Sequence, residues 1–350
     1  MTRALTGGVF GSTSGPDDFT ELRQLADDIG EQSFDARIGH RELPDEFDTA
    51  AWHHLQDAGL TRLTSDPESG GGPQELALVL RALARHAVTV PLAETDLLAG
   101  WLASTAGLEV PDQGPLTIAT GPAGATTVAG VPYASTAGAV VLALRDGSAL
   151  RVAIVQPANV IAGHNLGGEP RDTITVEAAT EFVTIDGAAD ELMRRGAWAR
   201  CVQALGALDA AVEFSVAHTR EREQFGRPLS AFQAVQHTLA SMAGEVERAR
   251  AATELAVAAV TDHGFAHAQA DYAITVAKVV LGRVVPTVVT AAHQLHGAIG
   301  VTLEHRLWLA TMRARSWIDE FGDTASHATR LGRLALASDG DPWDFVVGCY

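Results

Sequence analysis

The chain has 350 residues, a hydrophobic fraction of 47% and a formal net charge of −18 at pH 7. The hydrophobic fraction is enough to fill a large core, and the acidic balance argues against nucleic acid or anionic membranes as partners, because both attract basic surfaces. Two cysteines, Cys201 and Cys349, have no spacing typical of a zinc site or a disulfide framework. We therefore expect a globular protein of the reducing cytoplasm.

The first hundred residues have helical periodicity. Segments such as FTELRQLADDIG and ELALVLRALARHA place apolar residues at i, i+3, i+4 and i+7, and Gly and Pro clusters separate them. No apolar stretch reaches the ~18 uninterrupted residues of a membrane span, and the first residues lack the apolar centre of a signal peptide. We expect an N-terminal helical domain over 16–112 and no membrane contact.

The middle of the chain changes to short β-branched runs. TTVAGVPYA, AVVLAL, RVAIVQP and TITVEA are separated by Gly, Pro, Asn and Asp, which is typical of strands joined by turns. This pattern predicts a small β domain over 113–187.

Long helical periodicity returns after the β region. It predicts a bundle of long helices over 188–337, followed by a tail over 338–350. Pro286 lies inside one of these segments and should kink or split it. The order of helices, a small β unit and a second helical region indicates an α+β fold.

Most catalytic motifs are missing from the chain. It has no phosphate-binding loop, no dinucleotide fingerprint after a strand, no HExxH and no nucleophile elbow. The Gly-rich stretches Ser69–Leu76 and Gly163–Pro170 are interpreted as loops in preference to ligand cradles, because neither lies between a strand and a helix in the required order.

The histidines do not predict a metal site. His293 and His296 are three residues apart, but no third ligand of suitable spacing accompanies them, so we interpret them as helix-end residues. His53 and His54 are adjacent on a predicted helix and point to different faces. We expect no metal.

Two junctions in the C-terminal region carry more information. In REREQFGRPLSAFQ, a helix runs out before Phe225 and Gly226, and Ser230 is placed to cap the next helix. These structural roles do not require Arg222, which suits a diphosphate, or the amide of Gln233.

The second junction is QLHGAIGVTLEH. Gln294 is followed by a Gly-Ala-Ile-Gly turn, which permits a close approach of the backbone to a neighbour.

Together these segments resemble the acyl-CoA dehydrogenase family of flavoproteins. The resemblance is carried by AHTREREQFGRPLSAFQAVQHTLASM, AKVVLGRVV and HQLHGAIGVTLEHRLWLATMRA, with support from the N-terminal LQDAGLTRLTSDPESGGGPQELALVLRALARHAVTVPLAET. It implies an N-terminal helical domain, a middle β domain and a C-terminal four-helix bundle, usually in a tetramer. It also implies FAD, oxidation of an acyl-CoA thioester to the α,β-enoyl product, and an electron-transfer flavoprotein as electron acceptor.

The resemblance also assigns residues to FAD. Arg222 and Gln224 match the pair near the diphosphate, Phe232 and Gln233 match the FQ pair near the adenosine, and a QxxGG-like turn follows. The full set of FAD positions that the resemblance implies is Arg222, Gln224, Phe225, Phe232, Gln233, Gln294, Gly297 and Ala298. Ala298 replaces the second Gly of the turn. In the family, these positions mostly contact the flavin of a neighbouring subunit.

The catalytic base of the family is not where it is expected. The family uses a carboxylate to remove the α-proton, either after the last bundle helix or on the first one. The corresponding residues are Gly322 and Gly196. Asp323 is the best remaining candidate for the base, with Glu320 as another, and the alternative for Asp323 is a turn or helix-cap residue.

The β region departs from the family as well. It is short, and it lacks a clear TEPxxGSD-like loop or Trp-Ile-Thr segment, so its own flavin-ring pocket is expected to be incomplete. The chain resembles the degenerate subunit of actinobacterial α2β2 acyl-CoA dehydrogenases that act on steroid side-chain thioesters. The leading hypothesis is that a second subunit supplies the base and holds most of the FAD.

Three alternatives remain open on the sequence. The chain is a self-sufficient homotetramer that uses Asp323 or Glu320, a non-catalytic structural relative, or a related flavin oxidase or hydroxylase, for which nothing in the sequence gives positive support. Arg313 and Arg315 are candidates for anion contacts to CoA, with surface or inter-helix ion pairs as the other interpretation.

Overall fold

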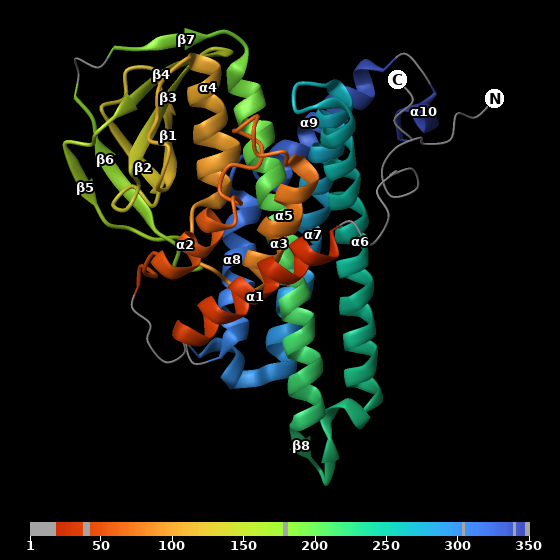
Figure 1. Cartoon of the computed structure of the whole chain (residues 1–350). Coiled ribbons are helices and arrows are strands. Elements are labelled where there is room, and N and C mark those ends of the chain that lie inside the picture. Colours follow the sequence, from red (N-terminus) through yellow and green to blue (C-terminus); the bar gives the residue numbers. More distant parts are fainter. Residues whose placement is uncertain (1–18, 38–42, 178–180, 303–304, 339–340, 347–350) are drawn as a thin grey trace.

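The computed structural model describes residues 19–37, 43–177, 181–302, 305–338 and 341–346. The expected order of helices, a β region and further helices is present (Figure 1).

The N-terminal helices are amphipathic and pack against the C-terminal bundle. Along α3, Leu76, Val79, Leu80 and Leu83 are all buried, which is the i, i+3, i+4, i+7 face that the sequence predicts. A π-helical segment, η2, carries the chain on into α4. The elements are α1 (Thr20–Arg37), α2 (Thr49–Asp57), α3 (Pro73–Arg85), η2 (Glu94–Gly100) and α4 (Trp101–Ala106).

The middle region consists of two sheets. One has the strand order β1-β3-β4-β7, with β1 parallel to β3 and the other pairs antiparallel, and the second has the order β2-β6-β5. The strands are β1 (Leu116–Pro122), β2 (Thr127–Pro132), β3 (Ala139–Asp146), β4 (Ala149–Val155), β5 (Asn159–Ile161), β6 (Arg171–Thr175) and β7 (Val183–Ile185). Leu102 of α4 packs with Val141 and Val152 of the first sheet, so α4 covers one face of that sheet.

The C-terminal region consists of long helices around α5. Its elements are α5 (Ala188–Glu221), β8 (Glu223–Gln224), β9 (Arg227–Pro228), η3 (Leu229–Ala231), α6 (Gln233–His263), α7 (Ala268–His296), η4 (Gly297–Val301), α8 (Arg306–Asp319), α9 (Thr324–Ala337) and α10 (Pro342–Val346). A Cβ on Gly206 of α5 would collide with the Arg81 carbonyl of α3, so glycine lets these two helices approach closely. One hydrophobic core joins α1, α2 and α3 to the bundle.

Helix α7 is the most apolar element of the bundle. Pro286 does not split it, because the helix is continuous from Ala268 to His296. The segment Ala268–Val301 is long and apolar enough to cross a membrane by length and composition, and its most apolar window has a mean hydropathy of 1.6. Since 61% of its most apolar window is buried inside the structure, α7 has the character of a core helix in a folded domain.

Candidate functional site

The first candidate motif forms a projecting hairpin between α5 and α6. The two-residue strands β8 and β9 pair Glu223 with Pro228 and Gln224 with Arg227, and Phe225 and Gly226 form the loop. Both loop residues have positive φ, 54° and 77°, as a tight two-residue hairpin of the I′ type requires. The hairpin lies at the far end of the long helices in Figure 1.

The side chains of this hairpin face outward. Arg222 and Gln224 are exposed, and Phe225 is 92% exposed, although a phenyl ring normally stabilises a protein by burial. The ring of Phe225 makes an edge-to-face contact with Phe232, and the Arg227 guanidinium lies 4.0 Å from the centroid of the Phe232 ring. These contacts hold the hairpin in shape without burying its tip.

The prediction that Ser230 caps the next helix is wrong. Helix α6 begins at Gln233, and its N-cap position is Phe232, which makes no side-chain cap hydrogen bond. Ser230 lies in the short helix η3, where its carbonyl accepts a hydrogen bond of 2.9 Å from Nε2 of Gln236. The chain therefore enters α6 through a 3-10 turn. The side-chain hydrogen bond at this entry goes to a backbone carbonyl, whereas an N-cap side chain would accept one from a backbone amide.

The second candidate motif is the turn after α7. Gly297 has φ 63° and ψ −142°, a conformation that is essentially restricted to glycine, and it directs the chain into η4. Gln294, Gly297 and Ala298 are exposed, and a Cβ on Gly297 would meet no atom within 4 Å. The turn thus presents open backbone and an amide side chain to the outside.

A histidine pair brings the two motifs together. The rings of His218, one helical turn before Arg222, and His296, two residues after Gln294, stack with centroids 4.5 Å apart. The hairpin and the turn therefore leave the bundle side by side, although 72 residues separate Arg222 from Gln294 in the sequence.

The two positions expected for the base lie beside one phenyl ring. Gly196 is buried in α5, and a Cβ on it would fall inside van der Waals contact with Phe321. Gly322 follows that ring with φ 94°, and a Cβ there would lie 2.7 Å from Nε2 of His327. Phe321 therefore occupies the space next to Gly196.

Glu320 belongs to a buried network of charges. Its carboxylate accepts hydrogen bonds from Arg171 at 2.7 Å and from Arg200 at 2.6 Å, and Arg200 also pairs with Glu94 at 2.6 Å. Burial favours the neutral form of Glu320, but the two guanidinium groups outweigh it and lower the pKa of Glu320 to about 2. A carboxylate held in this way is a weak base.

Asp323 is the N-cap residue of α9. Its Oδ1 accepts a hydrogen bond of 2.8 Å from the Ser326 amide, and its side chain is exposed. This hydrogen bond stabilises the charged form and lowers the pKa of Asp323. The geometry is that of the helix cap which the sequence left open as the alternative to a base.

The Gly-rich stretch 163–170 lies between β5 and β6 and packs against α8 of the bundle. Glu169 in this loop accepts hydrogen bonds from Trp317 of α8, at 2.9 Å, and from Asn165 within the loop, at 2.7 Å. Gly167 lies directly against the backbone of Arg313, where a Cβ would collide. This contact explains the glycine at that position by packing.

Arg313 is buried and pairs within the chain. Its Nη2 lies 2.9 Å from a carboxylate oxygen of Asp45, and its Nη1 donates to the carbonyl of Val88 at 2.9 Å. Of the two arginines considered for CoA, Arg313 thus makes a buried ion pair with the segment that precedes α2, whereas Arg315 is half-buried.

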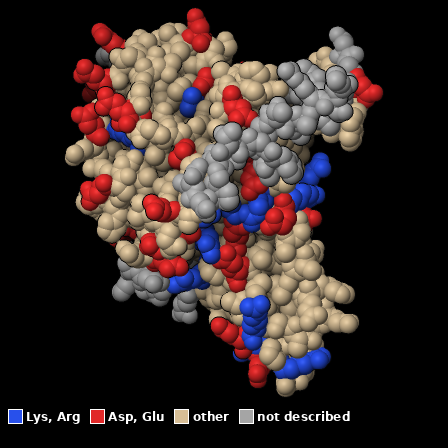
Figure 2. All heavy atoms as spheres, turned by 45° about the vertical axis from the view of Figure 1, so that its right-hand side comes forward, with Lys and Arg blue, Asp and Glu red and all other residues tan. Residues whose placement is uncertain are grey.

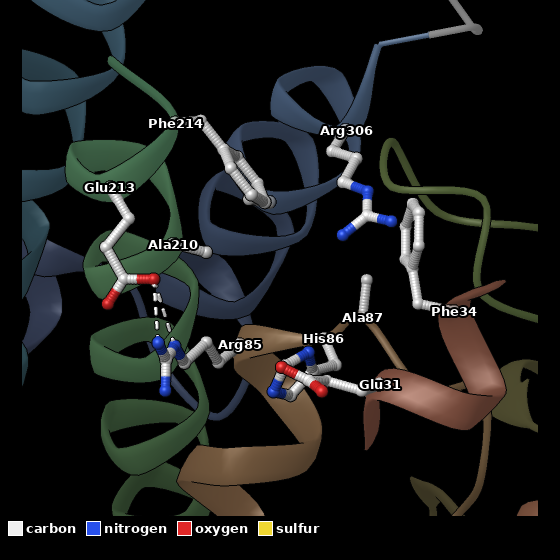
Figure 3. A pocket seen from close by; sticks show the side chains of 10 residues that line it. Glu31, Phe34, Arg85, His86, Ala87, Ala210, Glu213, Phe214 and Arg306 are labelled. Atoms are coloured by element: carbon white, nitrogen blue, oxygen red, sulfur yellow. Dashed lines mark hydrogen bonds and ion pairs between the residues drawn. The ribbon is translucent and has the colours of Figure 1, made fainter. Parts of the chain in front are cut away.

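A cavity of about 130 Å³ opens between α1, α3, α5 and α8 (Figure 3). Arg85 in its wall donates to Glu213 at 2.9 Å, and the guanidinium of Arg306 lies 4.0 Å from the ring centroid of Phe34. Two acidic and two basic residues, Glu31, Glu213, Arg85 and Arg306, line the cavity, so their formal charges cancel and do not select an anion or a cation.

Comparisons with known proteins relate the chain to one family. Residues 187–333 match the model described as the acyl-CoA dehydrogenase C-terminal domain. Probable acyl-CoA dehydrogenase FadE2 of Mycobacterium tuberculosis is 34% identical over 144 residues, which cover 40% of this chain and 34% of FadE2. Acyl-CoA dehydrogenase IpdE2 of M. tuberculosis is 28% identical over 284 residues, which cover 77% of this chain and 81% of IpdE2.

Two solved structures contain chains of similar fold. A chain of the ChsE4-ChsE5 complex from M. tuberculosis has a TM-score of 0.78 at 22% identity and covers 93% of this chain and 99% of that chain. A chain of the Tcur3481-Tcur3483 steroid ACAD G363A variant has a TM-score of 0.77 at 25% identity and covers 91% of this chain and 98% of that chain.

Proposed function

This chain belongs to the acyl-CoA dehydrogenase family, and we propose that it is one subunit of a heteromeric enzyme that oxidises an acyl-CoA thioester to its α,β-enoyl product. In this assembly a second family member supplies the carboxylate base and holds most of the FAD. This chain contacts the same FAD through the hairpin after α5 and the turn after α7.

The observation that carries the proposal is the Phe321 ring packed against Gly196. A base must lie within hydrogen-bond reach of the α-proton that it removes. Neither Gly196 nor Gly322 has a side chain, and Phe321 fills the space beside the first of them. Asp323 and Glu320 are the two nearby carboxylates that the sequence singles out. Asp323 caps a helix, and Glu320 makes partly buried ion pairs with two arginines. These engagements favour a base from another chain.

The exposed residues of the two motifs fit FAD chemically. The guanidinium of Arg222 matches the charge and geometry of a diphosphate, and Phe225 and Phe232 offer apolar surface. Gln224, Gln233 and Gln294 have exposed amides that can donate and accept hydrogen bonds. The open backbone at Gly297 and Ala298 completes a surface that can lie against a ligand held by a neighbour. Bound FAD would supply the acceptor for the β-hydride.

The surface of α6 supports a protein partner. From Gln233 to Gly244 the helix contains no charged residue, yet Ala234, Ala240 and Ala243 are exposed. Figure 2 shows an uncharged area on the right-hand side of the lower part of the molecule, with basic and acidic side chains along its left edge and near its tip. Charged residues are depleted at the centres of protein interfaces, so this face is suited to another subunit.

The substrate class follows from the family and from the steroid ACAD among its structural neighbours. We infer a CoA thioester of a steroid side chain as the first substrate to test and a straight-chain acyl-CoA as its comparison. An electron-transfer flavoprotein is the expected electron acceptor.

Co-expression tests the proposal directly. The partner to test is an acyl-CoA dehydrogenase family member encoded next to this chain's gene. The chain is purified alone, this partner is purified alone, and the two are purified together; FAD per chain and acyl-CoA-dependent dye reduction are then measured for each. We expect stoichiometric FAD and turnover only from the pair. Stoichiometric FAD and dye reduction by the chain alone would overturn the proposal, and a failure of the pair to associate would overturn it as well.

A further inference from the structure

Three histidines from three different elements meet where the hairpin and the turn leave the bundle. His218 lies on α5, His296 ends α7, and His305 is the N-cap of α8. One ring nitrogen from each lies within 4.8 Å of the others. The sequence does not predict this group. His218 lies far from His296 in the chain, and a turn separates His305 from His296.

His296 has the arrangement of a metal ligand. Its Nδ1 lies 2.8 Å from the carbonyl oxygen of Ala292 and donates to it, which places the lone pair on Nε2. That Nε2 is buried and has no hydrogen-bond partner among the described residues, and the side chain is only 6% exposed. Metal-binding histidines usually donate their second ring N–H to a carbonyl or carboxylate in this way.

The environment keeps His296 in the form that binds metals. Burial lowers the pKa of His296 to about 4, so the imidazole is neutral at pH 7. Burial also lowers the pKa of His218 and of His305. Neutral imidazole nitrogen is a preferred ligand of Zn²⁺, Cu²⁺ and Ni²⁺.

The other two histidines must adjust to bind an ion. Zn–N bonds of about 2.0–2.1 Å place tetrahedral ligand atoms roughly 3.4 Å apart, closer than the 4.8 Å limit of this group. His218 is half-buried near the C-terminal end of α5, and its ring must move from its stacked position on His296 to bring its nitrogen closer. His305 accepts the Leu307 amide through Nδ1 at 3.1 Å, and coordination by either of its nitrogens gives up this cap hydrogen bond.

We propose that His218, His296 and His305 form a binding site for a divalent transition metal such as Zn²⁺, with its fourth position open to water or an anion. Three protein ligands and one open position are the arrangement of catalytic zinc sites, and here the open position lies at the end of the bundle that carries Arg222 and Gln294. The inference rests on the histidine geometry alone and not on the proposed heteromer.

A second histidine pair provides a matched control. His263 and His267 also stack, with ring centroids 4.8 Å apart, but both are exposed, and no third histidine joins them within the described residues. If stacked histidines alone were enough to bind a metal, this pair would bind as well.

The experiment uses the full chain without a histidine tag, freed of metal by a chelator. Binding of Zn²⁺ is measured by calorimetry, and Co²⁺ is added to record the visible absorption of a tetrahedral site. We expect one equivalent of Zn²⁺ per chain and a Co²⁺ spectrum, with affinity lowered at least 10-fold in H296A and in H218A. The double variant H263A/H267A should bind as the unchanged chain does.

The third ligand is tested with H305N. Asparagine is a good N-cap residue, so this variant keeps a cap for α8 while it removes the imidazole. Weaker binding in H305N with unchanged thermal unfolding supports the three-histidine site. The proposal is overturned if the unchanged chain binds no metal at micromolar concentration, or if H218A and H305N, which are not fully buried and should fold, both bind as tightly as the unchanged chain.

Discussion

Phe321 and Gly196 are in direct contact, and the contact leaves no room for a side chain at residue 196. The ring belongs to the link between α8 and α9, whereas the glycine lies in the first third of α5. The guanidinium of Arg200, one helical turn after Gly196, lies 5.6 Å from the centroid of the same ring. A position at which the sequence resemblance leads us to expect a carboxylate is therefore filled by an aromatic ring next to paired charges.

The first prediction concerns this contact. Gly196→Ala should lower the free energy of unfolding by about 1–3 kcal/mol, because the added methyl group forces the Phe321 ring out of its position. Phe321→Ala makes room for it, so the double variant should be more stable than the sum of the two single effects predicts. Urea unfolding of the four proteins measures this coupling. Strictly additive effects would show that the two residues do not compete for space.

Asp323 can be tested as cap and as base with two substitutions. Asparagine is as good an N-cap as aspartate, whereas alanine removes the cap. Asp323→Asn in the assembled enzyme should therefore leave both turnover and thermal stability unchanged, and Asp323→Ala should lower the thermal stability without loss of turnover. Loss of turnover in Asp323→Asn with intact stability would instead identify Asp323 as the base.

Much of the architecture follows from local patterns in the sequence. The apolar face of α3 and the helix break at Phe225 and Gly226 can be predicted, because hydrophobic period and backbone preference are properties of short segments, whereas the hairpin that the break forms was not predicted. The resemblance of the two C-terminal motifs to one family also depends on contiguous residues. The position of Phe321 against Gly196 is different, because 125 residues separate them and nothing local records the contact.

Ion pairs between residues far apart in the chain are also not predictable from local sequence. Arg313 was interpreted from the sequence as either a CoA contact or an inter-helix ion pair, and only the fold shows that Asp45 is its partner, 268 residues away. Glu320 was a candidate base because of its place next to the expected motif. Its two arginine partners come from β6 and α5, so the network that lowers its pKa depends on how the β region and the bundle pack together.

The third prediction is a pH dependence of stability that arises at Glu320. Its pKa is about 2 in the folded chain against 4.5 as the ordinary value, so the folded state binds fewer protons and is favoured above pH 4.5. This stabilisation should be lost as the pH falls from 4.5 to 2. At 1.36 kcal/mol per pKa unit it amounts to about 3 kcal/mol.

Glu320→Gln separates this effect from general acid unfolding. At pH 7 the variant should be less stable by about 3 kcal/mol, because the charge that pairs with Arg171 and Arg200 is lost. The difference from the unchanged chain should shrink as the pH falls below 4.5. Glu109→Gln, at an exposed position, should follow the unchanged chain throughout. A constant difference between Glu320→Gln and the unchanged chain would contradict the assignment.

The last prediction addresses the hairpin. Arg222 and Arg220 are both exposed and two residues apart, but only Arg222 matches the FAD-contacting motif. In the co-purified assembly, Arg222→Ala should weaken FAD binding by about 10- to 150-fold, which corresponds to the ~1.5–3 kcal/mol of a hydrogen bond to a charged group. Arg220→Ala should leave it unchanged. FAD retained after dialysis and the flavin absorption spectrum measure this directly.

Because both side chains are exposed, thermal unfolding of the chain alone should be the same for both variants, so a loss of FAD cannot be attributed to unfolding. Equal FAD affinity in the two variants would show that the hairpin does not reach the diphosphate.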